Sequence, residues 1–167
     1  MLRVIAASIY NEWAMSVVDL PDETATAAFA ARIAALAEIG DVIALKGDLG
    51  AGKTTFARAF IRACGGMEVV PSPTFTLVQI YDLAPAAIWH FDLYRLKSPD
   101  EAWELGIEDA FGGGISLIEW PEQLGHLLPR YRLEITFLFA DRPEARRAVI
   151  AAGGDWQERL AGIVADA

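Results

Sequence analysis

Residues 47–54 of this 167-residue chain, GDLGAGKT, constrain its fold more than any other segment. They match the pattern G-x-x-x-x-G-K-[ST] at every fixed position, between an apolar run typical of a strand and a pattern typical of a helix. Glycines let the backbone turn so that successive N–H groups point at phosphate oxygens, and the dipole of the following helix adds positive potential. The motif therefore predicts a nucleotide site, with Lys53 on the β- and γ-phosphates and Thr54 on Mg²⁺.

The nucleotide-binding residues expected from the motif follow one another through the loop and into the helix: Asp48, Leu49, Gly50, Ala51, Gly52, Lys53, Thr54 and Thr55. Thr55 is expected to donate a hydrogen bond to the α-phosphate. GTPases of this class usually read guanine through an Asn-Lys-x-Asp element. The one asparagine of the chain, Asn11, lies far before the motif, so this route to guanine is excluded and ATP is the predicted nucleotide.

Apolar runs along the chain predict strands that alternate with helices. The expected strands are 16–20, 42–45, 87–91, 115–118 and 133–139, and the expected helices are 22–38, 53–64 and 99–111. Gly40 is expected to stop the first helix and Ser98 to cap the last. This order predicts a single α/β domain over residues 15–167, with helices on both faces of a mostly parallel sheet. Residues 1–14 are interpreted as an N-terminal extension, and Met15 is the hypothesised physiological start.

Composition narrows the possible functions. The chain has 14 Lys and Arg against 23 Asp and Glu, a net charge of -9, whereas binding to a phosphate backbone needs a basic face. Independent nucleic-acid binding is therefore not expected. The single cysteine, Cys64, excludes an internal disulfide, and no apolar run approaches the ~20 residues of a membrane helix. We expect a cytoplasmic protein without a membrane span.

Two acidic residues, Asp92 and Glu119, follow predicted strands directly. Ligands of open α/β sheets bind beyond the carboxyl ends of strands, so both are candidates for holding Mg²⁺ or orienting the attacking water. The sequence leaves open which residue has which role. Thr74, in the stiff segment PSPTF, is a candidate sensor of the γ-phosphate or Mg²⁺. His90 is expected to be a hydrogen-bonded core or supporting histidine rather than a general base.

Five segments occur in a recognisable order across residues 17–153: GDLGAGKTT, SPTF, HFDLYRL, ELGIED and LIEWPE. This set resembles the TsaE family, P-loop ATPases that assist threonylcarbamoyladenosine synthesis on tRNA. The phosphate loop alone is common, whereas HFDLYRL followed by LIEWPE is far more specific. The resemblance implies a P-loop NTPase three-layer sandwich with antiparallel edge strands. It also implies slow hydrolysis of ATP with Mg²⁺ and docking on a TsaB–TsaD heterodimer, which modifies adenosine 37 and holds the tRNA.

The family pattern also implies roles for single residues. The implied catalytic set is Lys53, Glu119, Asp92 and Thr74, and the implied metal set is Thr54, Glu119 and Asp92. Thr74 corresponds to the first switch loop, and Trp120 to a tryptophan close to the nucleotide. A glycine-arginine pair often meets the base in this family. Here the segment is Ala-Arg-Arg, and Arg147, or else Arg146, is assigned to the adenine pocket.

Two other function classes stay open. A small-molecule or nucleotide kinase usually needs an arginine-bearing lid, whereas residues 122–132 are short and have one arginine before Tyr131. Phosphoryl transfer to a nucleoside or sugar would identify such a kinase. A nucleotide-gated interaction module would need ATP binding without hydrolysis. A Glu119→Ala variant that still supports repeated rounds of tRNA modification would identify that module.

Overall fold

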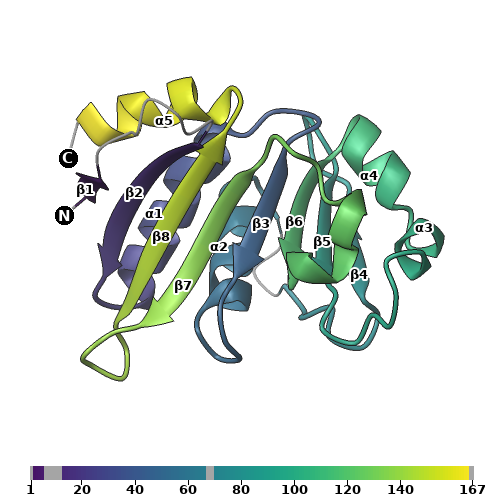
Figure 1. Cartoon of the computed structure of the whole chain (residues 1–167), viewed down its shortest axis with the longest axis horizontal. Coiled ribbons are helices and arrows are strands. Elements are labelled where there is room, and N and C mark those ends of the chain that lie inside the picture. The colour runs from purple at the N-terminus through teal and green to yellow at the C-terminus, as the bar shows by residue number, and fades with distance from the viewer. Residues whose placement is uncertain (1, 6–12, 67–69, 166–167) are drawn as a thin grey trace.

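The computed structural model describes residues 2–5, 13–66 and 70–165, which form one sheet with helices on both faces (Figure 1). The strands are β1 (Leu2–Ile5), β2 (Trp13–Leu20), β3 (Val42–Lys46), β4 (Val78–Tyr81), β5 (Ile88–Asp92), β6 (Ile115–Glu119), β7 (Leu133–Phe139) and β8 (Arg146–Gly153). The helices are α1 (Glu23–Leu36), α2 (Lys53–Ala63), α3 (Glu101–Glu104), α4 (Ile107–Gly113), the 3-10 helix η1 (Pro121–Leu127) and α5 (Trp156–Ala165). None of the helices in the described ranges is both long and apolar enough to cross a membrane.

Four parallel strands form the centre of the sheet, whose order is β1-β2-β8-β7-β3-β6-β5-β4. On one side the sheet continues with β8, β2 and β1, each antiparallel to its neighbour. On the other side it ends with β4, which is antiparallel to β5. The predicted parallel centre with antiparallel edge strands is therefore confirmed. All five residues of β6 and the first four of β3 are buried, as expected where helices cover both faces of a sheet.

Side chains that alternate across the sheet contribute to two separate cores. Leu45 of β3 packs in the core that contains residues of α1, α2 and α5. Val42, three residues earlier on the same strand, faces the other side of the sheet and packs with residues of α3, α4 and η1. Figure 1 shows α1 and α2 behind the sheet. Phe56 of α2 is fully buried, and its ring centre lies 5.6 Å from those of Phe29 in α1 and Phe137 in β7. These contacts hold the helix that follows the phosphate loop against the sheet.

The first predicted helix begins as expected but ends earlier. Asp22 caps α1 by accepting a hydrogen bond from the Ala25 N–H at 2.8 Å. The helix ends at Leu36, because the backbone of Ala37 is already extended. Gly40 therefore does not stop the helix, and its φ of 92° belongs to the turn before β3.

The predicted helix over residues 99–111 is divided into α3 and α4. The break is at Gly106, whose φ is 81° and where a Cβ would lie 3.0 Å from the Trp89 ring. Close packing against β5 thus requires glycine and a left-handed backbone in the middle of the predicted helix. Ser98 is not the cap of α3, because Asp100 precedes that helix and makes no side-chain cap.

The N-terminal strands extend the sheet beyond the predicted start of the domain. β2 begins at Trp13, and β1 pairs with it so that Ile5 lies opposite Met15. Residues 6–12 lie outside the described part of the chain. A physiological start at Met15 and the status of residues 1–14 as an extension stay predictions.

Candidate nucleotide site

The loop between β3 and α2 turns at glycines. Gly47, Gly50 and Gly52 have φ angles of 132°, 78° and 115°, a region that L side chains rarely adopt. A Cβ on Gly47 would also lie 2.5 Å from the Phe137 carbonyl oxygen of β7, so a larger residue does not fit there. The loop therefore leads from the end of β3 into the N-terminus of α2, the arrangement that binds phosphate through backbone N–H groups.

Lys53, the first residue of α2, is only 4% exposed. Its Nζ donates to the carbonyl oxygens of Gly47 at 2.6 Å and Asp48 at 2.9 Å, and lies 4.2 Å from the centre of the Trp120 ring. Burial lowers the pKa of Lys53, and the nearby carboxylate of Glu119 acts in the opposite direction. Two carbonyls and an aromatic face hold the ammonium group without neutralising it, so its charge is available to an anion in the pocket.

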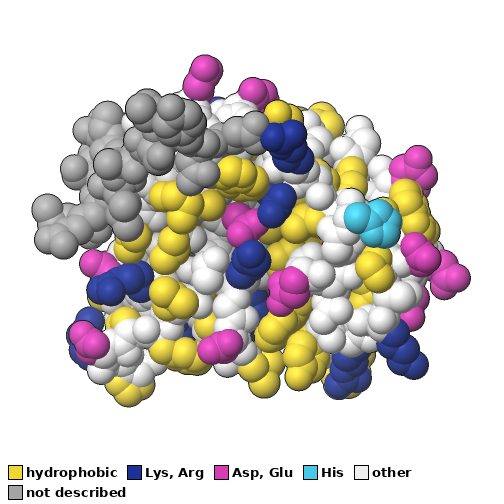
Figure 2. Space-filling model, in the orientation of Figure 1, with side chains coloured by type: hydrophobic (Ala, Val, Ile, Leu, Met, Phe, Trp, Pro, Cys, Tyr) yellow, Lys and Arg dark blue, Asp and Glu magenta, His cyan; other side chains and the backbone are white. Residues whose placement is uncertain are grey.

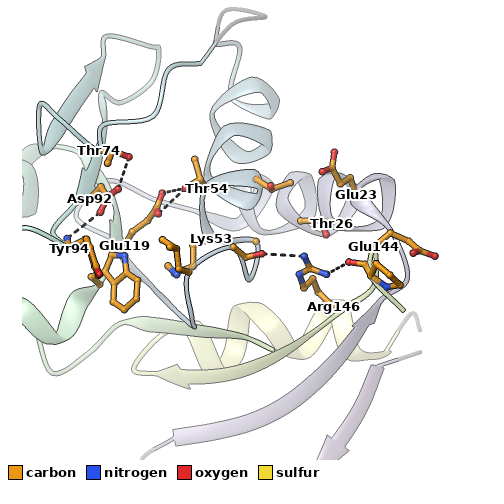
Figure 3. A pocket seen from close by; sticks show the side chains of 16 residues that line it. Glu23, Thr26, Lys53, Thr54, Thr74, Asp92, Tyr94, Glu119, Glu144 and Arg146 are labelled. Atoms are coloured by element: carbon orange, nitrogen blue, oxygen red, sulfur yellow. Dashed lines mark hydrogen bonds between the residues drawn. The ribbon is translucent and has the colours of Figure 1, made fainter. Parts of the chain in front are cut away.

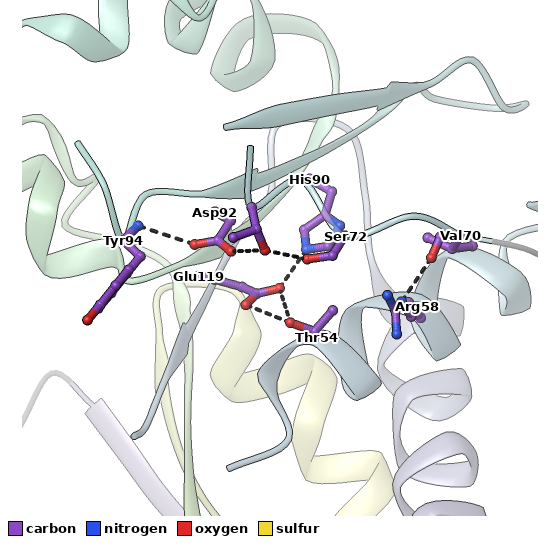
Figure 4. Close-up of polar contacts among 9 residues, drawn as sticks. Thr54, Arg58, Val70, Ser72, His90, Asp92, Tyr94 and Glu119 are labelled. Atoms are coloured by element: carbon purple, nitrogen blue, oxygen red, sulfur yellow. Dashed lines mark hydrogen bonds and ion pairs between the residues drawn. The ribbon is translucent and has the colours of Figure 1, made fainter. Parts of the chain in front are cut away.

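Glu119 is the last residue of β6, and its carboxylate is held from two sides (Figure 4). Thr54 Oγ1 lies 3.0 Å from Oε1 and 2.9 Å from Oε2 of Glu119, and His90 Nε2 lies 2.8 Å from Oε1. Thr54 and Glu119, two of the predicted metal ligands, are therefore in direct contact. His90 is fully buried, which confirms the expectation of a hydrogen-bonded supporting histidine.

Asp92 ends β5 opposite Glu119 in the parallel pairing of β5 and β6. Its Oδ2 accepts a hydrogen bond from Thr74 Oγ1 at 3.1 Å, and its Oδ1 accepts one from the Tyr94 N–H at 3.2 Å. The hydroxyl of Thr74 lies 2.7 Å from that of Ser72 (Figure 4). Asp92 and Thr74 thus form a second carboxylate–hydroxyl pair beside that of Glu119 and Thr54. This second pair ties the loop that contains Thr74 to the end of β5.

These groups line an elongated pocket of about 440 Å³ (Figure 3). Thr74, Asp92 and Glu119 lie at one end and Lys53 lies in the middle. The opposite end is lined by Glu23, Thr26, Glu144 and Arg146. The residues of that opposite end come from α1, from the β7–β8 connection and from the first position of β8, and apart from the arginine no sequence motif marked them.

Most of the predicted loop residues line the pocket. They are Leu49, Gly50, Gly52, Lys53, Thr54 and Thr55. Asp48 contributes its carbonyl oxygen to Lys53 instead, and Ala51 is buried in the core. Trp120 lines the pocket, with its ring centre 4.9 Å from that of Tyr94, and its proximity to a nucleotide stays a prediction. A left-handed backbone at Trp120, with a φ of 58°, directs the chain away from β6 at this point.

Arg146, and not Arg147, reaches the pocket. Arg146 Nη2 donates to the Gly50 carbonyl of the phosphate loop at 3.2 Å, and its Nη1 donates to the Pro143 carbonyl at 2.7 Å. Arg147 Nε donates instead to Asp19 of β2 at 2.9 Å, outside the pocket. Successive side chains of a strand point to opposite faces, so only one of two adjacent arginines can face the loop. Of the two arginines named for the adenine pocket, Arg146 therefore lines the pocket and Arg147 does not, and the contact with adenine stays a prediction.

The sequence that forms this pocket matches a known family. The family model described as threonylcarbamoyl adenosine biosynthesis protein TsaE matches residues 20–149, which include every residue of the pocket. The chain belongs to the TsaE family. One TsaE protein, from Rickettsia bellii, is 45% identical over 123 residues, or 73% of this chain and 85% of that relative. Another, from Bacillus subtilis, is 39% identical over 138 residues, or 82% of this chain and 85% of that relative.

A solved structure supports the same assignment. The crystal structure of YdiB from Bacillus subtilis is similar with a TM-score of 0.76 at 30% identity, and the match covers 92% of this chain and 97% of that one. The resemblance inferred from the five sequence segments and the predicted three-layer α/β fold are both confirmed. The names of the TsaE relatives place them in the biosynthesis of tRNA threonylcarbamoyladenosine.

Proposed function

We propose that this TsaE-family protein is a Mg²⁺-dependent ATPase required for the N6-threonylcarbamoyladenosine modification of tRNA, and that it acts on a TsaB–TsaD complex by binding and hydrolysing ATP. One observation carries the proposal: Lys53 and Thr54 of the phosphate loop share a pocket with the carboxylates of Asp92 and Glu119. Phosphoryl transfer requires phosphate-binding donors, a metal and a group that orients the nucleophile. The pocket has a candidate residue for each requirement.

Thr54 and Glu119 are the side chains that we expect to hold Mg²⁺. Hydroxyl and carboxylate oxygens are hard ligands, and these two groups meet at one point of the pocket, 2.9 Å apart. Residues 2–5, 13–66 and 70–165 contain no cluster of three or more His, Cys, Asp and Glu arranged for a metal. That fits Mg²⁺, which in nucleotide sites takes one or two carboxylates together with phosphate oxygens and water. When bound, the ion would neutralise charge on the phosphates.

Asp92, supported by Thr74, is the side chain that we expect to orient the attacking water. It is 6% exposed, and both of its oxygens already accept hydrogen bonds, from Thr74 and from the Tyr94 N–H. These bonds hold the carboxylate in one orientation at the end of the pocket beyond Lys53 (Figure 3). The metal role goes to Glu119 and the water role to Asp92 because Glu119 contacts Thr54, whereas Asp92 contacts the loop of Thr74.

The opposite end of the pocket has side chains suited to adenine. Adenine presents an exocyclic N–H donor where guanine presents a carbonyl acceptor. Glu23 and Glu144 line this end, and ionised carboxylates accept hydrogen bonds but cannot donate them. The guanidinium of Arg146 makes its bonds there to backbone carbonyls. We therefore expect the two carboxylates to favour ATP over GTP.

A variant with both Glu23→Gln and Glu144→Gln is expected to discriminate less between the two nucleotides. Glutamine amides donate as well as accept, so the guanine oxygen gains a partner. The ratio of the Kd for GTP to the Kd for ATP is expected to fall about tenfold, because a hydrogen bond to a charged group contributes roughly 1.5–3 kcal/mol. Displacement of a fluorescent ATP analogue measures both constants. Glu158→Gln, an exposed change on α5, is the control, and an unchanged ratio would contradict the assignment.

A partner is expected to complete the end of the site that holds the γ-phosphate. The cationic side chains among the described residues that line the pocket are Lys53 and Arg146, and Arg146 lies at the opposite end (Figure 3). Arginines supplied in trans stabilise the transition state of other P-loop proteins. A site without its own arginine near the γ-phosphate supports slow hydrolysis by the protein alone and faster hydrolysis in the complex.

The tRNA is expected to be held by the partners. The chain has a net charge of -9. On the face drawn in Figure 2, Lys and Arg side chains are interspersed with Asp and Glu instead of forming one basic patch. Electrostatic attraction to a phosphate backbone needs such a patch. In this proposal the protein supplies the ATPase step in the cytoplasm, and TsaB–TsaD supplies the contact with tRNA.

Phosphate release from ATP, measured with the protein alone and with TsaB–TsaD, tests the proposal. We expect a slow rate alone and a rise of at least about tenfold in the complex, because a partner group completes the site. Radiolabelled phosphate that appears on a nucleoside or sugar instead of in solution would identify a kinase. A fast rate that is indifferent to both partners would contradict the proposed role.

A further inference from the structure

His90 lies in a position that packing alone does not explain. Its side chain is completely buried on β5, where the neighbouring residues Ile88 and Phe91 are apolar. Burial of an imidazole costs the hydrogen bonds that its nitrogens make with water, so a residue needed only to fill space would be apolar. His90 recovers part of this cost through one contact, 2.8 Å from its Nε2 to Oε1 of Glu119.

The contact fixes which nitrogen carries the proton. An ionised carboxylate only accepts hydrogen bonds, so the Nε2 of His90 is the donor. Its Nδ1 is buried and has no hydrogen-bond partner among the described residues. The one polar contact of the imidazole among the described residues is therefore directed at Glu119 (Figure 4).

The bond also fixes the plane of the Glu119 carboxylate. Thr54 Oγ1 lies at nearly equal distances, 3.0 and 2.9 Å, from the two Glu119 oxygens, so it does not by itself select one of them. His90 binds Oε1 and not Oε2, so it distinguishes the two oxygens that Thr54 does not. Groups that orient metal ligands in this way change metal affinity or activity by about 10–100-fold when they are lost.

We infer that His90 is a positioning residue, which orients the carboxylate of Glu119 for Mg²⁺ through the hydrogen bond from its Nε2. The inference rests on the proposed function, because it assumes that Glu119 serves a nucleotide-bound metal. His90 touches neither nucleotide nor water in this role. Its effect is therefore on the Mg²⁺ dependence of the site and on kcat, and much less on the binding of ATP itself.

Two variants with the same amide group test the inference. In His90→Gln the side-chain amide nitrogen takes the position of Nε2 and can still donate to Glu119. In His90→Asn the amide nitrogen takes the position of Nδ1 and cannot reach. We expect His90→Asn to lower kcat by about 10–100-fold with a KM for ATP within about threefold of wild type, and His90→Gln to recover most of that loss. Thermal unfolding of both variants measures the cost of lost packing.

A binding measurement gives a second readout that needs no turnover. The affinity for a non-hydrolysable ATP analogue is titrated against Mg²⁺, and we expect His90→Asn to need about 10-fold more Mg²⁺ than wild type and His90→Gln to need nearly the wild-type amount. Should His90→Asn not fold, His90→Phe provides the same contrast with His90→Gln. Equal losses of kcat and of Mg²⁺ affinity in His90→Gln and His90→Asn, or wild-type values in both variants, would overturn the inference while the proposed function stands. A wild-type protein that neither binds nor hydrolyses ATP would overturn the proposed function, and this inference with it.

Discussion

A Lys53→Ala variant is expected to lose ATPase activity, with kcat/KM lowered by about 10²–10³. The carbonyls of Gly47 and Asp48 position Lys53 Nζ at the middle of the pocket, between the end lined by Glu119 and the end lined by Glu144. Alanine removes the one cation of the phosphate loop, and the remaining backbone N–H groups bind the phosphates without it. Both ATP affinity and turnover are therefore expected to fall, because the ammonium group interacts with the ground state and with the transition state.

Lys46→Ala is the matched control for this variant. Lys46 lies at the end of β3, just before the loop, and its Nζ pairs with Glu134 at 2.8 Å outside the pocket. Glu134 keeps Arg132 as a second partner, so the substitution removes one positive charge near the site without leaving a carboxylate unpaired. Phosphate release and analogue binding by Lys46→Ala are expected to match wild type. Wild-type kinetics in Lys53→Ala would remove the basis for placing phosphates in this pocket.

The phosphate loop and the two acids could be predicted from sequence because their geometry is local to single elements. A glycine-rich turn between a strand and a helix has few conformations. Asp92 and Glu119 each follow an apolar run, and parallel strands bring their carboxyl ends to one edge. The pairing of Asp92 with Glu119 in neighbouring strands follows from these rules. Thr74 could be proposed from the stiff segment PSPTF, and the family pattern supported the same role.

The end of the pocket lined by Glu23 and Glu144 could not be predicted, because it depends on how distant elements pack. Glu23 and Thr26 come from α1, and Glu144 comes from the β7–β8 connection more than a hundred residues later. No local pattern indicates that these segments meet. The choice between Arg146 and Arg147 depends on strand register, where a shift of one residue exchanges the faces. Packing against Trp89 likewise divided the predicted helix at Gly106.

A Glu119→Gln variant is expected to keep ATP binding and to lose hydrolysis, with kcat lowered by about 10²–10³. Glutamine has nearly the shape of glutamate, so the contacts with Thr54 and His90 can be kept in part, while the negative charge that we expect to hold Mg²⁺ is lost. Lys53 and the loop remain, and the affinity for ATP is expected to stay within about tenfold of wild type. Glu122→Gln, an exposed change three residues further on, removes the same charge near the pocket and is the control.

The decisive measurement with Glu119→Gln is tRNA modification through many turnovers. If hydrolysis resets a TsaB–TsaD complex, the variant should support about one round of threonylcarbamoyladenosine formation per complex and then stop, whereas Glu122→Gln should continue. If binding alone were sufficient, both variants would continue at the wild-type rate and the protein would be a nucleotide-gated interaction module. The two outcomes differ in the amount of product at long times, so they can be separated even when the initial rates are similar.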